Sequence, residues 1–324
     1  SVHVDSIDYL IGYNYRLHSL DCMNLKSKSV TQIVLPGDGP DAIVRLSGIY
    51  AQSLDSVWIS DESERAFLID SVGTIKRMID LKKYLEDQEQ LLINTNYAMF
   101  TSHLFYNASR HSLMFLVKHT PSNTFIVKEA FIDEVGKMAT YQLSSSKVVP
   151  DMSKGYAYIN FPNVNFVGEN IVYNYPVESS IYMLDIRTNE RKYILADSHY
   201  TSNIIEKCTT SGDYATLEKH WLENSHFYDI MYLPKYKIYA RLHADKVDFD
   251  EKKGMEKLIN ERDLYLMLFD ENMEKIGETK LSNCRYSPFT SWNATYGGIA
   301  LFVDNVLDEK NNTDDLTIDI ISLK

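Results

Sequence analysis

Several residue types are scarce in this chain of 324 residues, and each scarcity removes a class of protein from consideration. There are only three cysteines, Cys22, Cys208 and Cys284, and they lie far apart in the sequence. They form no Cys-x-x-Cys pair and no cysteine–histidine cluster, so zinc-site spacing is missing and at most one disulfide can form. No apolar run approaches the ~18 residues that a membrane-spanning helix needs.

Positive charge is also scarce. The chain has 33 lysines and arginines against 45 aspartates and glutamates, which gives a formal net charge of −12. Proteins that bind nucleic acids need a basic face that replaces counterions, and the basic residues here occur only as scattered singles and pairs. A nucleic-acid partner is therefore not expected, and an anionic membrane surface would repel the chain as a whole.

Tyrosine, in contrast, is abundant. There are 23 tyrosines against only 8 prolines and 13 glycines, in a chain that is 44% hydrophobic and 24% charged. This is an ordinary globular composition with ample length for a core. Since tyrosine favours half-buried pleated surfaces, the composition favours β-structure.

A repeated sequence unit gives the strongest indication of the fold. Its clearest copy runs from Asp55 to Leu81 and reads as strand, turn, strand ending in Asp70, glycine turn at 71–74, and strand. Such a unit cannot bury its faces alone and must stack on copies of itself. Six units of this kind can be marked, at 9–35, 48–79, 113–143, 170–195, 238–277 and 299–321.

The six units predict a single all-β domain over residues 1–324, a six-bladed β-propeller. Their mean spacing is about 54 residues, above the ~40–50 of propeller blades, and the surplus lies in connections. Helical insertions are expected at 213–224 and 248–262, with a helical turn within 81–93. The stretch 2–5 is expected to supply the fourth strand of the sixth unit, which leaves the first unit short of an inner strand. A pair of β-sandwiches is the alternative fold, and six blades are not distinguished from seven.

The strand, aspartate, turn, glycine, strand unit resembles the six-bladed TolB-like and NHL-like propellers. Three stretches resemble, more narrowly, an uncharacterised family of Bacteroides propeller lipoproteins that is known only as a domain of unknown function. These stretches are Gly37–Asp41, His226–Ile230 with its continuation to Tyr239–Arg241, and Gly298–Val303. The resemblance implies an exported protein at the periplasm or the outer-membrane surface, with a lipid anchor on an upstream cysteine. It brings no catalytic residues with it.

Two acidic patterns raise the question of a metal. Asp70, Asp133, Asp185 and Asp270 end strands of successive units, and we interpret them as caps of the following turns rather than as a cation-binding ring. The loop 304–309, with Asp314 and Asp315, is rich in the oxygen ligands that calcium prefers, but it lacks EF-hand spacing. We therefore predict no metal or other cofactor, with calcium at this loop as the alternative.

Six residues are candidates for ligand binding. Arg241 stands in the middle of an apolar strand, where it either forms a structural ion pair or holds an anionic ligand. His103 and Tyr106 lie in a polar cluster with Arg110 and His111, which suits acid–base work or simply a loop tip. The remaining three are aromatic and can either stack on a sugar or peptide or pack in the core, namely Trp221, Trp292 and Tyr296.

Three functions remain open on these residues. The first is a non-enzymatic binding or scaffold module for a glycan, a peptide or an envelope protein. The second is a hydrolase or lyase that acts on glycans or peptides with residues from different units, since such a site leaves no local motif. The third is a purely structural envelope component. No catalytic residue is identified, and the first hypothesis is preferred because aromatic and polar loops are plentiful.

Overall fold

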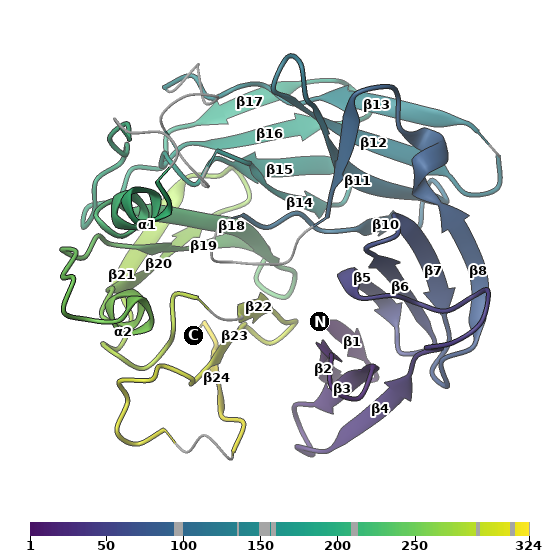
Figure 1. Cartoon of the computed structure of the whole chain (residues 1–324), viewed down its shortest axis with the longest axis horizontal. Coiled ribbons are helices and arrows are strands. Elements are labelled where there is room, and N and C mark those ends of the chain that lie inside the picture. The colour runs from purple at the N-terminus through teal and green to yellow at the C-terminus, as the bar shows by residue number, and fades with distance from the viewer. Residues whose placement is uncertain are drawn as a thin grey trace. The chain divides into compact units, whose positions relative to one another are not determined.

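The computed structural model describes residues 1–93, 100–134, 136–148, 156, 160–208, 213–289, 292–311 and 315–323. It contains six antiparallel sheets, one for each unit of the sequence, and only two α-helices among the described residues (Figure 1). The fold class is therefore the six-bladed β-propeller that the repeat predicts. The chain divides into two compact units. Unit 1 comprises Ser1–Thr95, Ser102–Leu143 and Thr295–Gly297, and unit 2 comprises Asn96–Thr101, Ser144–Ala294 and Gly298–Lys324.

Unit 1 holds the first three sheets, and in each the strands follow one another in sequence order (Figure 1). The first sheet consists of β1 (Val2–Val4), β2 (Ile7–Asn14), β3 (Ser19–Asn24) and β4 (Val30–Val34). The second consists of β5 (Leu46–Ser53), β6 (Ser56–Asp61), β7 (Arg65–Ile69) and β8 (Ile75–Asp80). The third consists of β10 (Phe105–Asn107), β11 (Ser112–His119), β12 (Thr124–Phe131) and β13 (Met138–Gln142), and β9 (Glu89–Leu92) also pairs with β11. The predicted helical turn after the second sheet is the 3₁₀ helix η1 (Leu81–Tyr84).

The N-terminal strand does not close the sixth sheet, so that prediction is wrong. Val2 pairs with Tyr9, and β1 is the first strand of a complete four-stranded first sheet. The reason is local. Asp5 and Ser6 both have positive φ, 48° and 63°, as the two central residues of a type I′ hairpin turn do. This turn folds the first strand directly back on β2.

Unit 2 holds the last three sheets. The fourth sheet consists of β14 (Asn163–Val167), β15 (Asn170–Asn174), β16 (Ile181–Asp185) and β17 (Arg191–Ile194). The fifth consists of β18 (His226–Leu233), β19 (Ile238–Ala244), β20 (Leu264–Phe269) and β21 (Lys275–Lys280). The sixth has three strands in the described part of the chain, β22 (Trp292–Ala294), β23 (Ile299–Phe302) and β24 (Ile318–Ile321).

Both predicted insertions contain a helix. The first is α1 (Tyr214–Leu222). It is capped by the preceding residue, Asp213, whose side chain accepts a hydrogen bond from the N–H of Ala215. The second is α2 (Met255–Asn260), which starts after Gly254 without a side-chain cap. Neither is long and apolar enough to cross a membrane, and the same holds for every helix among the described residues.

Strand β12 carries two oppositely charged residues that are adjacent in sequence and fully buried. The Lys128 ammonium lies 2.5 Å from a carboxylate oxygen of Glu89. The neighbouring Glu129 accepts hydrogen bonds from Arg110, Ser112 and Tyr141. Successive side chains of a strand point to opposite faces, so each charge has its own set of partners on its own face of the third sheet.

Candidate functional site

A cluster of half-buried aromatic rings lies where the first strands of the second and third sheets meet, in unit 1. Tyr50 of β5 packs edge-on against Phe105 of β10, with ring centroids 5.0 Å apart. The next residue, Tyr106, lies 5.7 Å from the buried Trp58 of β6. Burial raises the pKa of the Tyr50 hydroxyl. Three rings are thus held by a rigid scaffold while remaining partly exposed. We call Tyr50, Phe105 and Tyr106 the inner-strand aromatic cluster.

The polar residues predicted near Tyr106 have different surroundings. His103 is half-buried and lies two residues before β10 begins. Arg110, in contrast, donates from its Nε to Glu129 at 2.7 Å, and the exposed His111 lies 3.8 Å from Asp133. His103 and Tyr106 therefore lie in one short segment, whereas Arg110 is held by its hydrogen bond to Glu129 of the third sheet.

Tyr296 lies in another part of unit 1, against the β1–β2 hairpin. Its ring stacks on His3 with centroids 4.1 Å apart, and its backbone N–H donates to Asp8 at 3.2 Å. Asp8 also accepts from the N–H of Gly297 at 2.9 Å and pairs with His3 at 2.7 Å. Tyr296 is 42% exposed, so its ring is a surface group on a fixed turn.

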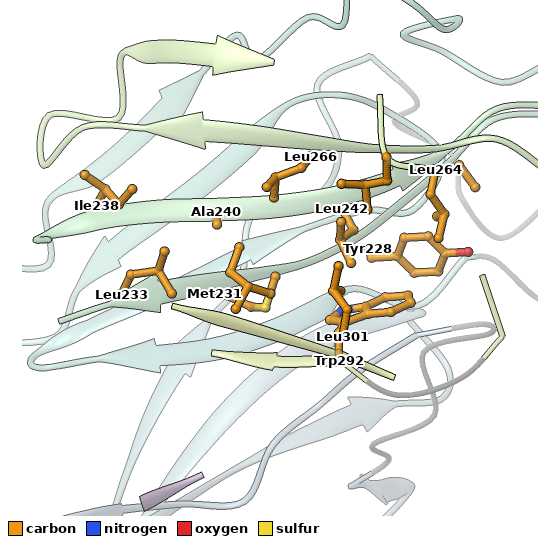
Figure 2. Close-up of a cluster of buried hydrophobic side chains, with 13 residues drawn as sticks. Tyr228, Met231, Leu233, Ile238, Ala240, Leu242, Leu264, Leu266, Trp292 and Leu301 are labelled. Carbon is orange, nitrogen blue, oxygen red and sulfur yellow. The ribbon is translucent and has the colours of Figure 1, made fainter. Parts of the chain in front are cut away.

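The structure brings Trp221 and Trp292 together in unit 2 through intervening rings. Trp221 of α1 donates from its indole nitrogen to His226 at 3.2 Å, and His226 packs on Tyr228. Tyr228 then meets Trp292 edge-on, with centroids 4.6 Å apart. Figure 2 shows Trp292 and Tyr228 packed with Leu301 and Leu242 in the core of the fifth and sixth sheets. Only 2% of Trp292 and 9% of Trp221 is exposed, so both indole rings belong to the core.

The surroundings of His226 in this cluster favour its neutral form. Burial, reinforced by the charge of Arg262, lowers its pKa well below the ordinary value of 6.5. Its Nδ1 accepts the indole hydrogen of Trp221, which places the ring proton on Nε2. Arg262 lies over the Trp221 ring at 5.2 Å and donates to the carbonyl oxygens of Asp245 and Asn224, both at 2.7 Å.

Arg241 is completely buried on β19, and its bonding partners differ from the predicted ion pair. Its guanidinium donates to the carbonyl oxygens of Ser179 at 2.6 Å and Ala196 at 3.0 Å. It also lies over the ring of Phe227 at 4.8 Å. Burial lowers its pKa to about 9, against the opposing attraction of Glu278 and other carboxylates nearby. The arginine therefore connects the fifth sheet to the backbone of the fourth.

Two residues beyond Arg241 on the same strand, His243 forms a polar relay that the sequence analysis did not identify. Its Nε2 lies 3.1 Å from a carboxylate oxygen of Glu278, and its Nδ1 lies 3.2 Å from the hydroxyl of Thr201. Burial lowers the pKa of His243. Burial alone would raise the pKa of Glu278, but hydrogen bonds from His243, Ser198, the His199 N–H and Lys275 hold it well below its usual range.

The relay also positions the loop that follows β17. Ser198 donates to Glu278 at 2.6 Å, and Tyr200 stacks on Tyr265 with centroids 4.9 Å apart. Since Tyr265 stacks in turn on His243, the loop is fixed to the fifth sheet by both charge and ring contacts. One sequence signal was available, because Arg241 and His243 are two polar residues on one face of a strand that is otherwise apolar. No comparable sequence signal marks Thr201 or Glu278.

The turn interpretation holds for three of the four aspartates. Asp70, Asp185 and Asp270 each accept two backbone N–H groups of the following turn, at 2.8–3.1 Å. The hydrogen bond from Lys76 is the largest cause that lowers the pKa of Asp70 to about 2. Asp133 instead pairs with Arg77 at 2.9 Å.

In the acidic loop, Asp304 accepts the N–H of Ser287 at 3.2 Å, and Asp308 accepts that of Lys310 at 3.0 Å. Asp314 of this loop lies outside the described residues. No group of three or more histidine, cysteine, aspartate or glutamate side chains is placed to hold a metal ion in the part of the chain that the structure describes. Calcium binding therefore stays an alternative that rests on the sequence alone.

The fold and its strand order define a six-bladed β-propeller, and comparison with known structures supports this class. A crystal structure from Bacteroides vulgatus superposes with a TM-score of 0.77 at 14% sequence identity, covering 99% of this chain and 91% of that one. A protein from Bacteroides fragilis that is predicted to be exported superposes with a TM-score of 0.56 at 14% identity, covering 96% of this chain and 86% of that one. Identities this low establish the fold alone.

The family follows from the sequence itself. Residues 3–280 match the model of DUF4221, a domain of unknown function, and the Bacteroides vulgatus structure is that of a DUF4221 member. The chain belongs to the DUF4221 family. Among curated proteins, none matches the sequence significantly.

Proposed function

We propose that this protein is a non-enzymatic binding module whose ligand is a glycan that stacks on the inner-strand aromatic cluster. The observation that carries the proposal is the partial exposure of Tyr50, Phe105 and Tyr106 on first strands of neighbouring sheets. Tyrosine combines a flat apolar ring with a hydroxyl that can donate and accept, and this combination suits the faces and hydroxyls of sugar rings. His103, half-buried in the same segment, adds a second polar group.

Burial favours this cluster over the two tryptophans. A ring that is already packed against Tyr228 and Leu301 must leave the core before it can touch a ligand, whereas a half-buried ring need not move. Arg241 is similarly committed to two carbonyl oxygens. Among the six candidate residues, Tyr106 and His103 are therefore the best placed for ligand binding, with the exposed Tyr296 as a separate surface.

The test is a thermal-shift screen against soluble oligosaccharides, followed by calorimetry on the best hit. A ligand at about a hundred times its dissociation constant adds roughly 2.7 kcal/mol of stability. Tyr106→Ala should weaken binding at least tenfold, and Tyr106→Phe should retain most of it if stacking dominates. Tyr15→Ala, at a tyrosine that is 72% exposed in the same unit, is the matched control. A screen in which peptides bind and sugars do not, or in which nothing binds, rejects the glycan proposal.

The proposal includes export to the periplasm or the outer-membrane surface, with a lipid anchor on an upstream cysteine. Support comes from the resemblance to envelope lipoproteins and from the relative in Bacteroides fragilis that is predicted to be exported. Fractionation of the native cells with an antibody against this protein tests the location. Recovery in the cytosolic fraction would reject it, and metabolic labelling with an alkyne fatty acid tests the anchor separately.

A second candidate function, a hydrolase that acts by acyl transfer, is favoured by the Thr201–His243–Glu278 relay. A neutral imidazole with Nε2 directed at a carboxylate can accept the hydroxyl proton of Thr201 at Nδ1. The threonine oxygen would then bond to a substrate carbonyl carbon, the bond from that carbon to the leaving group would break, and the leaving group would take the proton. Water would next attack the acyl-threonine ester, which releases the acid and restores the Thr201 hydroxyl. Labelling by a fluorophosphonate probe tests this candidate. It requires a signal that Thr201→Val abolishes and that the exposed control Thr188→Val keeps, and an unlabelled wild-type protein rejects it.

A further inference from the structure

Four rings of unit 2 form one stack across the fifth sheet. Phe227, His243 and Tyr265 lie opposite one another on the neighbouring strands β18, β19 and β20 (Figure 1). Their successive ring centroids are 5.4 Å and 5.0 Å apart, and the ring planes differ by 22° and 17°. Tyr200, on the loop that follows β17, adds the fourth ring, 4.9 Å from Tyr265 and tilted by 22°. We call these four residues the ring stack.

The ring stack begins in the core and ends at the surface. Phe227 and His243 are fully buried, and Tyr265 is only 5% exposed. Tyr200, in contrast, is 52% exposed. Because Tyr265 covers one face of the Tyr200 ring, the exposed part includes the opposite face, where a further member of the stack would lie. The last ring therefore presents a flat aromatic face to solvent.

The loop holds Tyr200 in a fixed position. The hydroxyl of Ser198 donates to the carboxylate of Glu278 at 2.6 Å and accepts from the N–H of Tyr200 at 2.9 Å. The N–H of His199 donates to the same carboxylate at 3.0 Å. The N–H of Ser198 donates to the side chain of Asn203 at 2.7 Å. Since the backbone beside the ring is already ordered, little conformational entropy is lost when a partner binds there.

A guanidinium already packs on the buried ring with which the stack begins. Arg241 lies over Phe227, with 4.8 Å between its guanidinium carbon and the ring centroid. A guanidinium is planar and weakly hydrated, and the negative face of an aromatic ring attracts it. Tyr200 offers the same kind of ring face at the surface.

The charge around the outer end of the ring stack is mainly negative. Burial, together with the carboxylates of Asp263 and Asp245, raises the pKa of the Tyr265 hydroxyl, and Lys280 acts in the opposite direction. Lys280 pairs with Asp263 at 2.7 Å, so two carboxylates stand against one lysine. The whole chain also carries a net charge of −12. These charges favour a cation over a neutral or anionic ligand.

We propose that the exposed face of Tyr200 is a docking site for an arginine side chain of a partner protein. The guanidinium extends the ring stack by one planar group, and the carboxylates of Asp245 and Asp263 attract its charge. Arginine fits better than lysine, because the lysine ammonium is a compact, strongly hydrated charge without a flat face. This docking site lies in unit 2 and uses neither the glycan cluster nor the chemistry of Thr201, so it can fail while those proposals stand.

Three fluorescent peptides test the chemistry of the ligand on the full 324-residue protein. Each consists of arginine, lysine or citrulline between two pairs of glycines, with blocked ends, and binding is followed by fluorescence anisotropy at low salt. Lysine keeps the charge without the plane, and citrulline keeps the plane without the charge. The arginine peptide should bind at least fivefold more tightly than either. Free arginine is the competitor, and tighter binding of free arginine than of the peptide would assign the face to a small molecule and overturn the proposal.

Variants of the protein test the position of the site. Tyr200→Leu keeps an apolar side chain against Tyr265 but removes the aromatic face, and should weaken binding of the arginine peptide at least fivefold. Tyr200→Phe should bind as the wild type does, and Asp263→Asn should bind more weakly. The control is Tyr214→Ala, at a tyrosine 64% exposed in the same unit, which should leave binding unchanged.

Three results would overturn the proposal: no binding of the arginine peptide, equally tight binding of the lysine or citrulline peptide, or wild-type affinity in Tyr200→Leu. Thermal unfolding shows whether each variant is folded. If Tyr200→Leu is unfolded, the three peptides on the wild-type protein and the loss of affinity in Asp263→Asn decide the question.

Discussion

The guanidinium of Arg241 donates to the carbonyl oxygen of Ser179 across 2.6 Å, from the second strand of the fifth sheet to a residue two positions before β16 of the fourth. A charged side chain thus fixes the position of a neighbouring sheet through backbone atoms. The carbonyl of Ala196 accepts from the same group, so both ends of the β16–β17 hairpin are held.

Replacing Arg241 by methionine should lower the free energy of unfolding by about 2–5 kcal/mol. The carbonyl partners belong to the backbone and cannot be exchanged for apolar groups, so they are left buried and unsatisfied. Arg241→Lys keeps the charge but reaches fewer acceptors, and should lie between methionine and wild type. Urea unfolding followed by circular dichroism measures the difference. A methionine variant as stable as the wild type would show that the contact contributes nothing.

Trp292→Ala should cost about 3–5 kcal/mol of stability, because it removes a ring that is 2% exposed and packed against Tyr228. Trp221→Ala should also destabilise, since it removes the donor to the buried His226. The control is Tyr214→Ala on the same helix α1, a residue 64% exposed, which should change stability by less than about 0.5 kcal/mol. Loss of ligand binding with unchanged stability in the tryptophan variants would instead assign them to a binding surface.

Acidification should destabilise the protein through His226. Its folded-state pKa lies well below 6.5 because of burial, so between these two values the unfolded chain binds a proton that the folded chain does not. Stability therefore falls as the pH drops below 6.5, by at most about 1.4 kcal/mol per pH unit for this one proton, and is level above it. His226→Gln, whose side-chain oxygen can still accept from Trp221, should show a shallower slope between pH 6.5 and 5 in urea titrations. Equal slopes in the two proteins would contradict this assignment.

Asn163→Asp should destabilise by about 1–3 kcal/mol at pH 7. The amide accepts from the N–H of Thr101 at 2.7 Å and donates to the carbonyl oxygen of Phe227 at 3.0 Å, so it needs both a donor and an acceptor. A carboxylate keeps the first bond and places an oxygen against the second. Asn272→Asp, at an exposed turn residue, is the matched control and should have little effect. Thermal unfolding of both variants distinguishes the outcomes.

The parts of the fold that sequence reasoning recovered are those that local chemistry determines. The middle strands are apolar runs that end at turns, as in β16 with Asp185, and α1 begins at a capping aspartate before an amphipathic stretch. First strands were harder to recognise. The sequence of β14, Asn-Val-Asn-Phe-Val, carries asparagines because Asn163 and Asn165 donate to carbonyl oxygens of β18, and this interrupts the apolar pattern.

The site could be predicted only in part, because its contacts join distant residues or backbone atoms. Arg241 stands out in an apolar strand, yet its acceptors are two carbonyl oxygens that no side-chain pattern encodes. The pairing of His243 with Glu278 joins residues 35 positions apart. The sequence could not indicate which aromatic residues stay half-buried, because the burial of Tyr106 and of Trp292 depends on which distant residues pack over each ring.

The adjacent charges Lys128 and Glu129 on β12 have a consequence for how the third sheet forms. If β12 slipped by one residue in one direction, Lys128 would take the place of Glu129 beside Arg110. If it slipped in the other direction, Glu129 would take the place of Lys128 beside Glu89, so either slip would replace an attractive contact by a repulsive one. Either misalignment thereby carries an electrostatic penalty beyond any loss of packing. The two charges therefore favour the native register of β12 during folding. A uniformly apolar strand would not discriminate against the neighbouring registers in this way.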